Sequence, residues 1–150
     1  MAMHRVVPVL LAALLAGAPL LGAERELVGS LRNLKGPVFL LRDGVERTIS
    51  RPERLYEGDV LRTGPGGSLG LLLRDDTSIS LGPESRVALE HFRFAPAQRE
   101  LGLVVRLFRG TMAFVSGIVA RLAPDSVKVE APVATVGVRG TTFLVKAEGE

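Results

Sequence analysis

Apolar and polar residues alternate along most of the chain beyond residue 37, in short runs that turn-forming residues separate. The clearest example is a pair of alternating runs at residues 38–42 and 45–49, with Asp43-Gly44 between them. An Asp-Gly pair suits the two positive-φ positions of a type I′ turn, whose twist matches that of antiparallel strands. The pattern therefore predicts a β-hairpin at residues 38–49.

Further runs recur at a spacing of about ten residues, which is typical of a sandwich, barrel or solenoid of short strands. They cover residues 60–63, 68–74, 77–81, 86–94, 101–108 and 127–130. Turn signals separate them at Glu57-Gly58-Asp59, Gly64-Pro65-Gly66-Gly67, Asp75-Asp76 and Arg109-Gly110. We expect a connecting loop at residues 50–56. Residues 116–122 have no clear period and also suit one or two helical turns.

Residues 131–145 consist almost entirely of small and β-branched residues and contain no acid, histidine or cysteine. We interpret this stretch as a closing pair of strands. In it, Ala134 and Gly137 would allow close approach of another backbone, and Gly140 would allow a bend.

Arg139 is the only charged residue of that stretch. A guanidinium in apolar surroundings usually needs carboxylate or carbonyl partners, and its planar shape suits bidentate pairing. One interpretation is an internal ion pair with Glu57, Asp59 or Asp75. The other is that Arg139 faces an anionic ligand or a carboxylate of a partner protein.

The N-terminal residues have the layout of a secretory signal peptide. His4 and Arg5 precede an uncharged run at residues 6–23, which ends in Gly22-Ala23 before the charged segment that begins at Glu24. We expect cleavage after Ala23, which would leave residues 24–150 as one β domain without a membrane span. The alternative is an uncleaved anchor, because the run reaches the shortest length that can span a bilayer.

Composition excludes several classes of function. The 150 residues fit a single domain, and the absence of cysteine excludes disulfides and thiolate metal sites. Sixteen arginines and three lysines face sixteen acids, and the basic residues form no block. With one tyrosine and no tryptophan, the chain lacks the aromatic platforms of a nucleic-acid binder. We expect no nucleic-acid partner.

The chain offers little for catalysis. Its aspartates lie beside glycine, proline or other turn formers, where their side chains usually bond the local backbone. Asp75-Asp76 is too sparse a set of acids for a Ca²⁺ loop, and His91 is the only histidine after residue 23. No serine lies in a Gly-x-Ser-x-Gly setting. We therefore expect no enzyme, no cofactor and no metal.

Four segments together resemble FecR-domain proteins, over roughly residues 27–146. They are residues 55–64, 74–85, 107–111 and 131–143, of which the last, Ala-Pro-Val-Ala-Thr-Val-Gly-Val-Arg-Gly-Thr-Thr-Phe, is the most specific. The residues of these motifs that we single out for a possible interaction are Asp59, Gly64, Gly137, Arg139, Gly140 and Thr141.

The resemblance implies a β-rich, non-catalytic module outside the inner membrane. In founding members of that family, such a module transmits the state of an outer-membrane iron-siderophore receptor to a sigma factor. Because only a short leader precedes residue 27, we expect a stand-alone exported FecR-domain protein. It would be an all-β fold of short antiparallel strands and hairpins, either solenoid-like, which the resemblance favours, or a compact sandwich.

The expected function is a periplasmic or secreted protein-interaction module that binds an envelope protein during sensing or signalling. The alternative is a module that binds a small anionic ligand or a glycan. The resemblance carries over no catalytic or ligand-binding residues.

Overall fold

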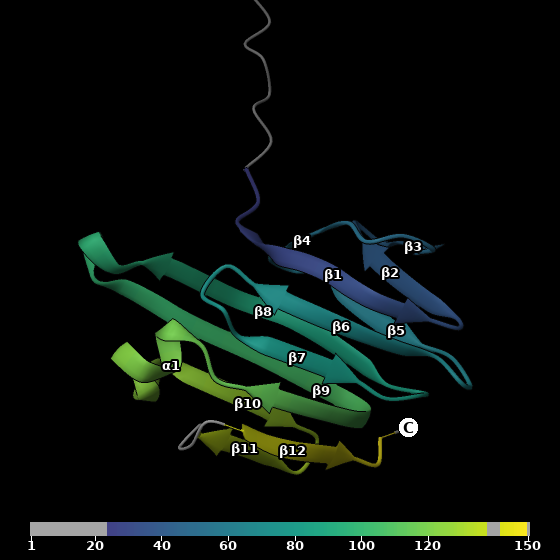
Figure 1. Ribbon diagram of the computed structural model, residues 1–150. Helices are drawn as coiled ribbons and strands as arrows, with labels where there is room; N and C mark the ends of the chain where they lie inside the picture. The colour runs from purple at the N-terminus through teal and green to yellow at the C-terminus, as the bar shows by residue number, and fades with distance from the viewer. Residues whose placement is uncertain (1–23, 138–141, 150) are drawn as a thin grey trace, which may run out of the picture.

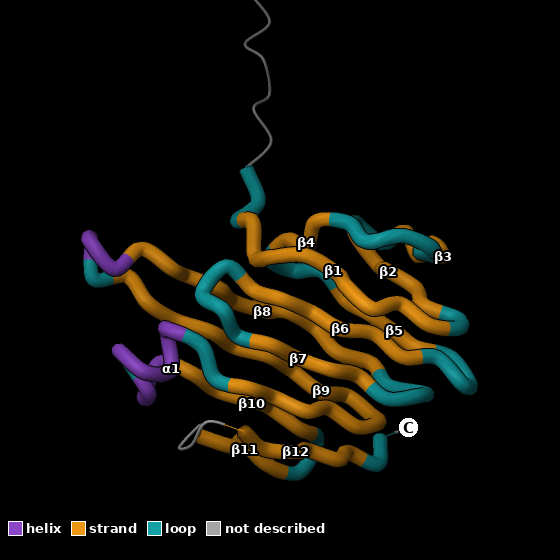
Figure 2. The backbone as a smooth tube through the Cα atoms, in the orientation of Figure 1, coloured by secondary structure: helices purple, strands orange, loops and turns teal. Residues whose placement is uncertain are grey.

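The computed structural model describes residues 24–137 and 142–149, apart from the side chain of Ala134. Figures 1 and 2 show that most of these residues lie in strands, which confirms the all-β prediction. The strands are β1 (Leu27–Lys35), β2 (Val38–Arg42), β3 (Val45–Thr48), β4 (Arg54–Tyr56), β5 (Val60–Thr63), β6 (Ser68–Leu73), β7 (Ser78–Leu81), β8 (Arg86–Ala95), β9 (Glu100–Val115), β10 (Val127–Ala131), β11 (Ala134–Gly137) and β12 (Thr142–Ala147). The helical segments are η1 (Pro96–Gln98), α1 (Ile118–Leu122) and η2 (Pro124–Ser126).

The strands form one curled sheet in the order β3-β2-β5-β8-β9-β7-β6-β1-β4. Its sixteen-residue strand β9 is shared by two halves. The first half of β9 pairs with β8 and β10, and the second half pairs with β7 and β12. The outermost strand β4 leads directly into β5 through the turn at residues 57–59, so the two halves curl toward one another around a common interior (Figure 1).

This arrangement distinguishes the two architectures expected from the sequence. Successive coils of a parallel solenoid pair in parallel, whereas here β9 and β10 form the only parallel pair among the described strands. All other paired strands are antiparallel, and the curled sheet encloses one core as a sandwich does. The solenoid-like form that the resemblance favoured is therefore not the one that these strands adopt.

The core forms from the apolar residues that the alternation placed on one face. Leu69, Leu71 and Leu73 of β6 are almost completely buried, as are Ile79 and Leu81 of β7. The largest buried side chains are Phe92 and Phe114. Each side chain of this size removed from water contributes about 1.5–3 kcal/mol, so the buried faces hold the two halves together.

Two turns form as the sequence predicts. Asp43 and Gly44 join β2 to β3 with φ of 54° and 76°, as a type I′ turn requires. In the turn at residues 64–67, the amide of Gly67 donates to the carbonyl of Gly64 at 2.9 Å, and Gly66 has φ of 72°. The first turn fixes the register of β2 on β3, and the second reverses the chain between β5 and β6.

Two details differ from expectation, and a third segment takes one of the forms that the sequence allowed. The segment at residues 50–56, predicted to be a loop, ends in the short strand β4, which pairs with β1. The interruption expected at Arg109-Gly110 does not end the strand, because β9 continues through it. The unclear segment at residues 116–122 contains the short helix α1. Among the described residues, no helix is long and apolar enough to cross a membrane.

The C-terminal stretch also differs in its pairing. Two strands form there, but β11 pairs with β10 and β12 pairs with β9, rather than with one another, among the described residues. The close backbone approach predicted at Gly137 is wrong, because no described atom lies within 4 Å of where its Cβ would be. The bend predicted at Gly140 lies outside the described residues.

A buried polar cluster fixes the point at which β9 passes from one half to the other. Gly110 has φ of 94°, and the neighbouring amide of Thr111 donates to Oγ of Ser85 at 3.0 Å. The amide of Ser85 in turn donates to Oγ1 of Thr63 at 2.9 Å, and that hydroxyl donates to the carbonyl of Gly82 at 2.6 Å. Ser85 and Thr63 are buried, so these hydrogen bonds satisfy polar groups that would otherwise be costly.

We predict that Gly110→Ala lowers the free energy of unfolding by about 3 kcal/mol, because it combines a strained φ with overpacking. An added Cβ would lie 2.5 Å from Cα of Ser85, which is backbone and cannot turn aside. Gly66→Ala is the matched control: its φ of 72° is also positive, but no atom lies within 4 Å of its Cβ. Urea unfolding of both variants measures the difference. Equal losses would show that Ser85 does not restrict this position.

Candidate functional site

The residues singled out from the sequence do not converge on one site. Arg139, Gly140 and Thr141 lie outside the described residues. Gly137 is exposed at the end of β11, whereas Asp59 is completely buried at the start of β5. Gly64 lies at the other end of β5, beside a small surface hollow. The structure therefore separates two buried positions, Asp59 and Gly64, from the exposed Gly137.

Asp59 holds the turn between β4 and β5 against β2. Its Oδ1 accepts from Nε of Arg42 at 2.8 Å, and its Oδ2 accepts from Nη2 at 2.6 Å, a bidentate pair. Oδ2 also accepts from the amide of Tyr56 at 2.8 Å. The guanidinium lies over the Tyr56 ring, 5.0 Å from its centroid. The hydrogen bond to Asp59 is the main cause that raises the pKa of Arg42 above its ordinary value.

Asp75 fixes the helical segment that follows β9. Its carboxylate accepts from the amide and the hydroxyl of Thr77, as expected of an aspartate in a turn. Its Oδ2 also accepts from the amide of Val119 at 3.1 Å, and its carbonyl accepts from Ile118 at 2.7 Å. Asp75 thus satisfies amides in the first turn of α1 from a distant part of the chain. No pattern in the sequence predicted this contact.

Glu57 is the third acid considered as a partner for Arg139. Its Oε2 accepts from the amide of Phe92 at 2.9 Å and from Nη1 of Arg93 at 2.8 Å. Like Asp59 and Asp75, it therefore already bonds described residues other than Arg139.

His91 lies beside Glu57, with its Nδ1 3.7 Å from Oε2, which is too long for a hydrogen bond. Its side chain is 45% exposed, on the surface of β8. Within residues 24–137 and 142–149, no group of three or more histidine, cysteine or acidic side chains could hold a metal ion. The carboxylates of Glu57, Asp59 and Asp75 accept from backbone amides or arginines, as is typical of acids that stabilise a fold.

The two most exposed large apolar residues among those described, Val133 and Leu144, lie near the C-terminus. Val133, in the turn before β11, is 96% exposed, Val136 of β11 is 36% exposed, and Leu144 of β12 is 74% exposed. We call Val133 together with β11 and β12 the C-terminal edge. Figure 1 shows it along one border of the molecule. Exposed apolar side chains gathered on strand edges are typical of surfaces that other proteins contact.

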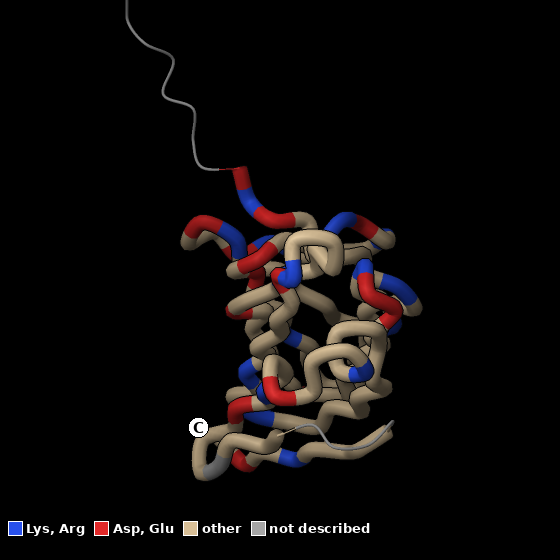
Figure 3. Tube along the Cα trace, turned by 90° about the vertical axis from the view of Figure 1, so that its left-hand side faces the viewer, with Lys and Arg blue, Asp and Glu red and all other residues tan. Residues whose placement is uncertain are grey.

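The opposite border of the same sheet is protected by charge. On β3, Glu46 accepts from Nη2 of Arg62 at 2.5 Å, and Arg47 pairs with Glu53. Charged side chains on an outer strand discourage pairing with another chain. Figure 3 shows that basic and acidic residues are interspersed over the molecule, and the outer strand β11, unlike β3, has none.

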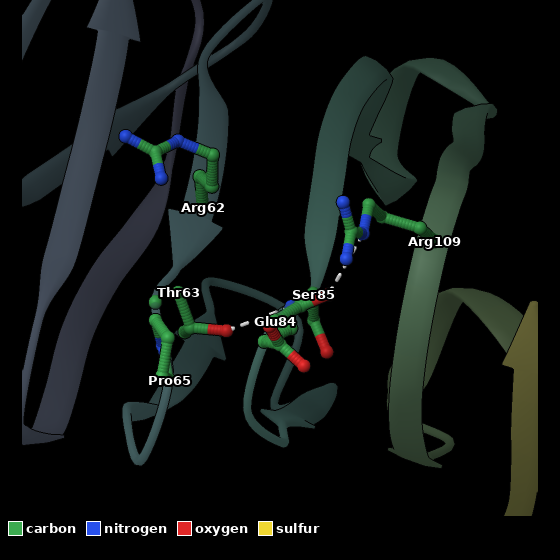
Figure 4. Close-up of a pocket in the computed structure, with 7 residues that line it drawn as sticks. Arg62, Thr63, Pro65, Glu84, Ser85 and Arg109 are labelled. Carbon is green, nitrogen blue, oxygen red and sulfur yellow. Dashed lines mark hydrogen bonds between the residues drawn. The ribbon is translucent and has the colours of Figure 1, made fainter. Parts of the chain in front are cut away.

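A small hollow of about 110 Å³ lies where β5, β8 and β9 meet. Figure 4 shows Arg62 and Arg109 extending from strands on either side of it, with Thr63, Glu84 and Ser85 between them. Nε of Arg109 donates to the carbonyl of Glu84 at 3.2 Å. The hydroxyls of Thr63 and Ser85 donate to backbone carbonyls, so the hydrogen-bond donors left at this hollow are guanidinium groups.

Comparison with known proteins gives one match. A family model described as FecR protein matches residues 59–150, which is well over half of the chain. The matched residues include β5 to β12, with Asp59, Asp75 and the C-terminal edge. Neither the curated proteins nor the solved structures contain a match.

We predict that Asp59 and Arg42 stabilise the fold as a coupled pair. Asp59→Ala and Arg42→Ala should each lower the free energy of unfolding by about 3 kcal/mol, because each leaves a largely desolvated charge without its bidentate partner. The double variant should reveal a coupling of about 2 kcal/mol. The same cycle on Arg106 and Glu130, an exposed pair at 2.7 Å, should give less than about 1 kcal/mol. Similar coupling in both cycles would contradict the structural role of Asp59.

Proposed function

The chain belongs to the FecR family, and we propose that it is a non-enzymatic protein-interaction module of the bacterial periplasm that takes part in envelope sensing or signalling. The FecR family is a regulatory and signalling family associated with the bacterial envelope. To this general role of the family we add a periplasmic location, the absence of catalysis and the surface that contacts the partner.

The leader supports export. An uncharged run at residues 6–23 follows a short basic start, and small residues precede the first charged segment. We propose that residues 1–23 are a signal peptide and that residues 24–150 act as one domain after cleavage. The intact mass of the exported protein tests this directly, because an uncleaved leader would leave the full mass.

The C-terminal edge is the observation that carries the interaction proposal. Its strand β11 bonds to β10 on one side, and no described strand pairs with its other side. An extended segment can add to such an edge through backbone hydrogen bonds while side chains set specificity. Val133 and Val136 would supply the apolar contacts, and β11 has no charge to repel a partner strand.

The acids support a non-catalytic role. General acid–base catalysis needs a carboxylate or imidazole that faces a substrate cleft. Asp59 and Asp75 are completely buried and bond backbone amides, and Glu57 bonds Arg93 and an amide. A hydrolase would have to use His91 or Asp76 as its acid or base, without help from Glu57, Asp59 or Asp75. For that reason we favour a binding function.

The second candidate is a module for a small anionic ligand or a glycan. The hollow beside Arg62 and Arg109 favours it, because two guanidinium groups border the same space. Thermal unfolding in the presence of anionic metabolites and cell-wall fragments separates the candidates. A saturable rise in melting temperature with one such compound would favour the ligand-binding function.

We predict that a photo-crosslinking amino acid at position 133 captures an envelope protein in living cells, whereas the same residue at position 45 does not. Val45 is the matched control, since it is 64% exposed on β3 at the other border of the sheet. Val136→Lys should reduce the cross-link at position 133 at least tenfold without changing the melting temperature, because a charge on an edge strand opposes strand addition. Equal capture from both positions, or none from either, would contradict the proposal.

A further inference from the structure

Three arginines occupy directly opposed positions on three neighbouring strands. Arg62 of β5 lies opposite Arg86 of β8, and Arg86 lies opposite Arg109 of β9. We call them the arginine row. Arg86 and Arg109 are exposed and Arg62 is half-buried, whereas the adjacent Leu61 and Val87 are buried in the core, so the row lies on the outer surface of the sheet. Since neighbouring strands are about 4.8 Å apart, the row spans about 10 Å.

The row contains more positive charge than the acids of the described residues pair with. Arg62 pairs with Glu46 at 2.5 Å. Among the described residues, no carboxylate lies within 4 Å of Arg86 or Arg109. The nearby Arg106 of β9 differs, because it pairs with both Glu90 and Glu130.

Like charges that face one another across strands destabilise a sheet. The positive charge of the row also acts on Glu46, which pairs with Arg62. The hydrogen bond from Arg62 is the main cause that lowers the pKa of Glu46, and the charge of Arg86 lowers it further. Such a row, in which two of the three arginines have no ion pair among the described residues, is expected where a ligand supplies negative charge.

The guanidinium groups are held in position before any ligand arrives. Arg62 lies 4.0 Å from the centroid of the Phe39 ring, and Arg86 lies 5.1 Å from that of Phe108. Nε of Arg109 is bonded to the carbonyl of Glu84. Stacking on a ring leaves the edge of a guanidinium available for a carboxylate, and it reduces the entropy lost when the carboxylate binds.

The spacing favours an extended ligand over a single small anion. The three groups come from separate strands, and Figure 4 shows Arg62 and Arg109 on either side of the hollow rather than converging on one point. The Phe39 and Phe108 rings are covered by arginines, so they offer no open platform for a nucleic-acid base. Side chains at positions i and i+4 of a helix have Cβ atoms about 5–6 Å apart, so two acids there present carboxylates at a similar spacing.

We propose that the arginine row binds an acidic segment of a protein, with Arg86 and Arg109 each pairing a carboxylate of the partner. This inference rests on the proposed function in taking the ligand to be a protein, and it adds the chemistry of that partner. The row is formed by β5, β8 and β9, whereas the C-terminal edge is formed by β11 and β12. The two contacts use different residues, so separate substitutions test them.

The test is fluorescence anisotropy with a labelled glutamate-rich peptide and the full chain. Arg86→Gln with Arg109→Gln should weaken peptide binding at least tenfold. Arg106→Gln and Arg121→Gln together are the matched control, because they remove the same net charge: Arg106 already has two acids, and Arg121 lies on α1. The control pair should change binding less than threefold. Added salt should weaken the wild-type complex.

A second measurement separates binding from folding. If the row is unneutralised, the Arg86→Gln, Arg109→Gln variant should melt no lower than the wild type at low salt, since like charges have been removed. Polygalacturonate and tripolyphosphate serve as competing probes. Four outcomes would each overturn the inference. They are no peptide binding, equal losses of binding in the control pair, unfolding of the double variant, and binding of polygalacturonate or tripolyphosphate in place of the peptide. None of these outcomes affects capture from position 133, which tests the proposed function.

Discussion

The fold depends on the passage of β9 from one half of the sheet to the other. This is possible because Gly110 adopts a φ of 94° with Ser85 packed against it. Oγ of Ser85 accepts from the amide of Thr111, so the polar groups of the bend remain paired inside the molecule. Asp59 and Asp75 act in the same way at two other places, where they hold the β4–β5 turn and the start of α1. Buried polar groups at turns, together with the apolar core, determine the curl of this sheet.

Local pattern predicted most of the strands but not their assembly. Alternation identified the buried faces of β6, β7 and β8, and Asp43-Gly44 identified the hairpin, because these signals act within a few residues. The strand β1 was not predicted, since Gly29 and Asn33 weaken its alternation. The short strand β4 exists through its pairing with β1, and the pairing of β11 with β10 depends on distant contacts. Such contacts leave no periodic signal in the sequence.

The same distinction applies to the candidate sites. Turn chemistry anticipated that the aspartates bond the backbone, as Asp75 does with Thr77. It gave no sign of the pair between Arg42 and Asp59, which joins residues seventeen positions apart. Nor did it indicate the arginine row, because Arg62, Arg86 and Arg109 are far apart in sequence and become neighbours only through strand register. The family motif marked the C-terminal edge, while its exposure became evident only from the fold.

We infer that the buried acids stabilise the fold and that the exposed C-terminal edge contacts the partner protein. Hydrogen exchange of the backbone amides, with and without the protein captured from position 133, tests this division most directly. We predict that the β11 amides that do not bond β10 exchange fast in the isolated protein and become protected in the complex, while the amides of Thr77 and Thr111 stay protected in both. Protection of β11 that is unchanged by the partner, or new protection confined to the turns of Asp59 and Asp75, would contradict it.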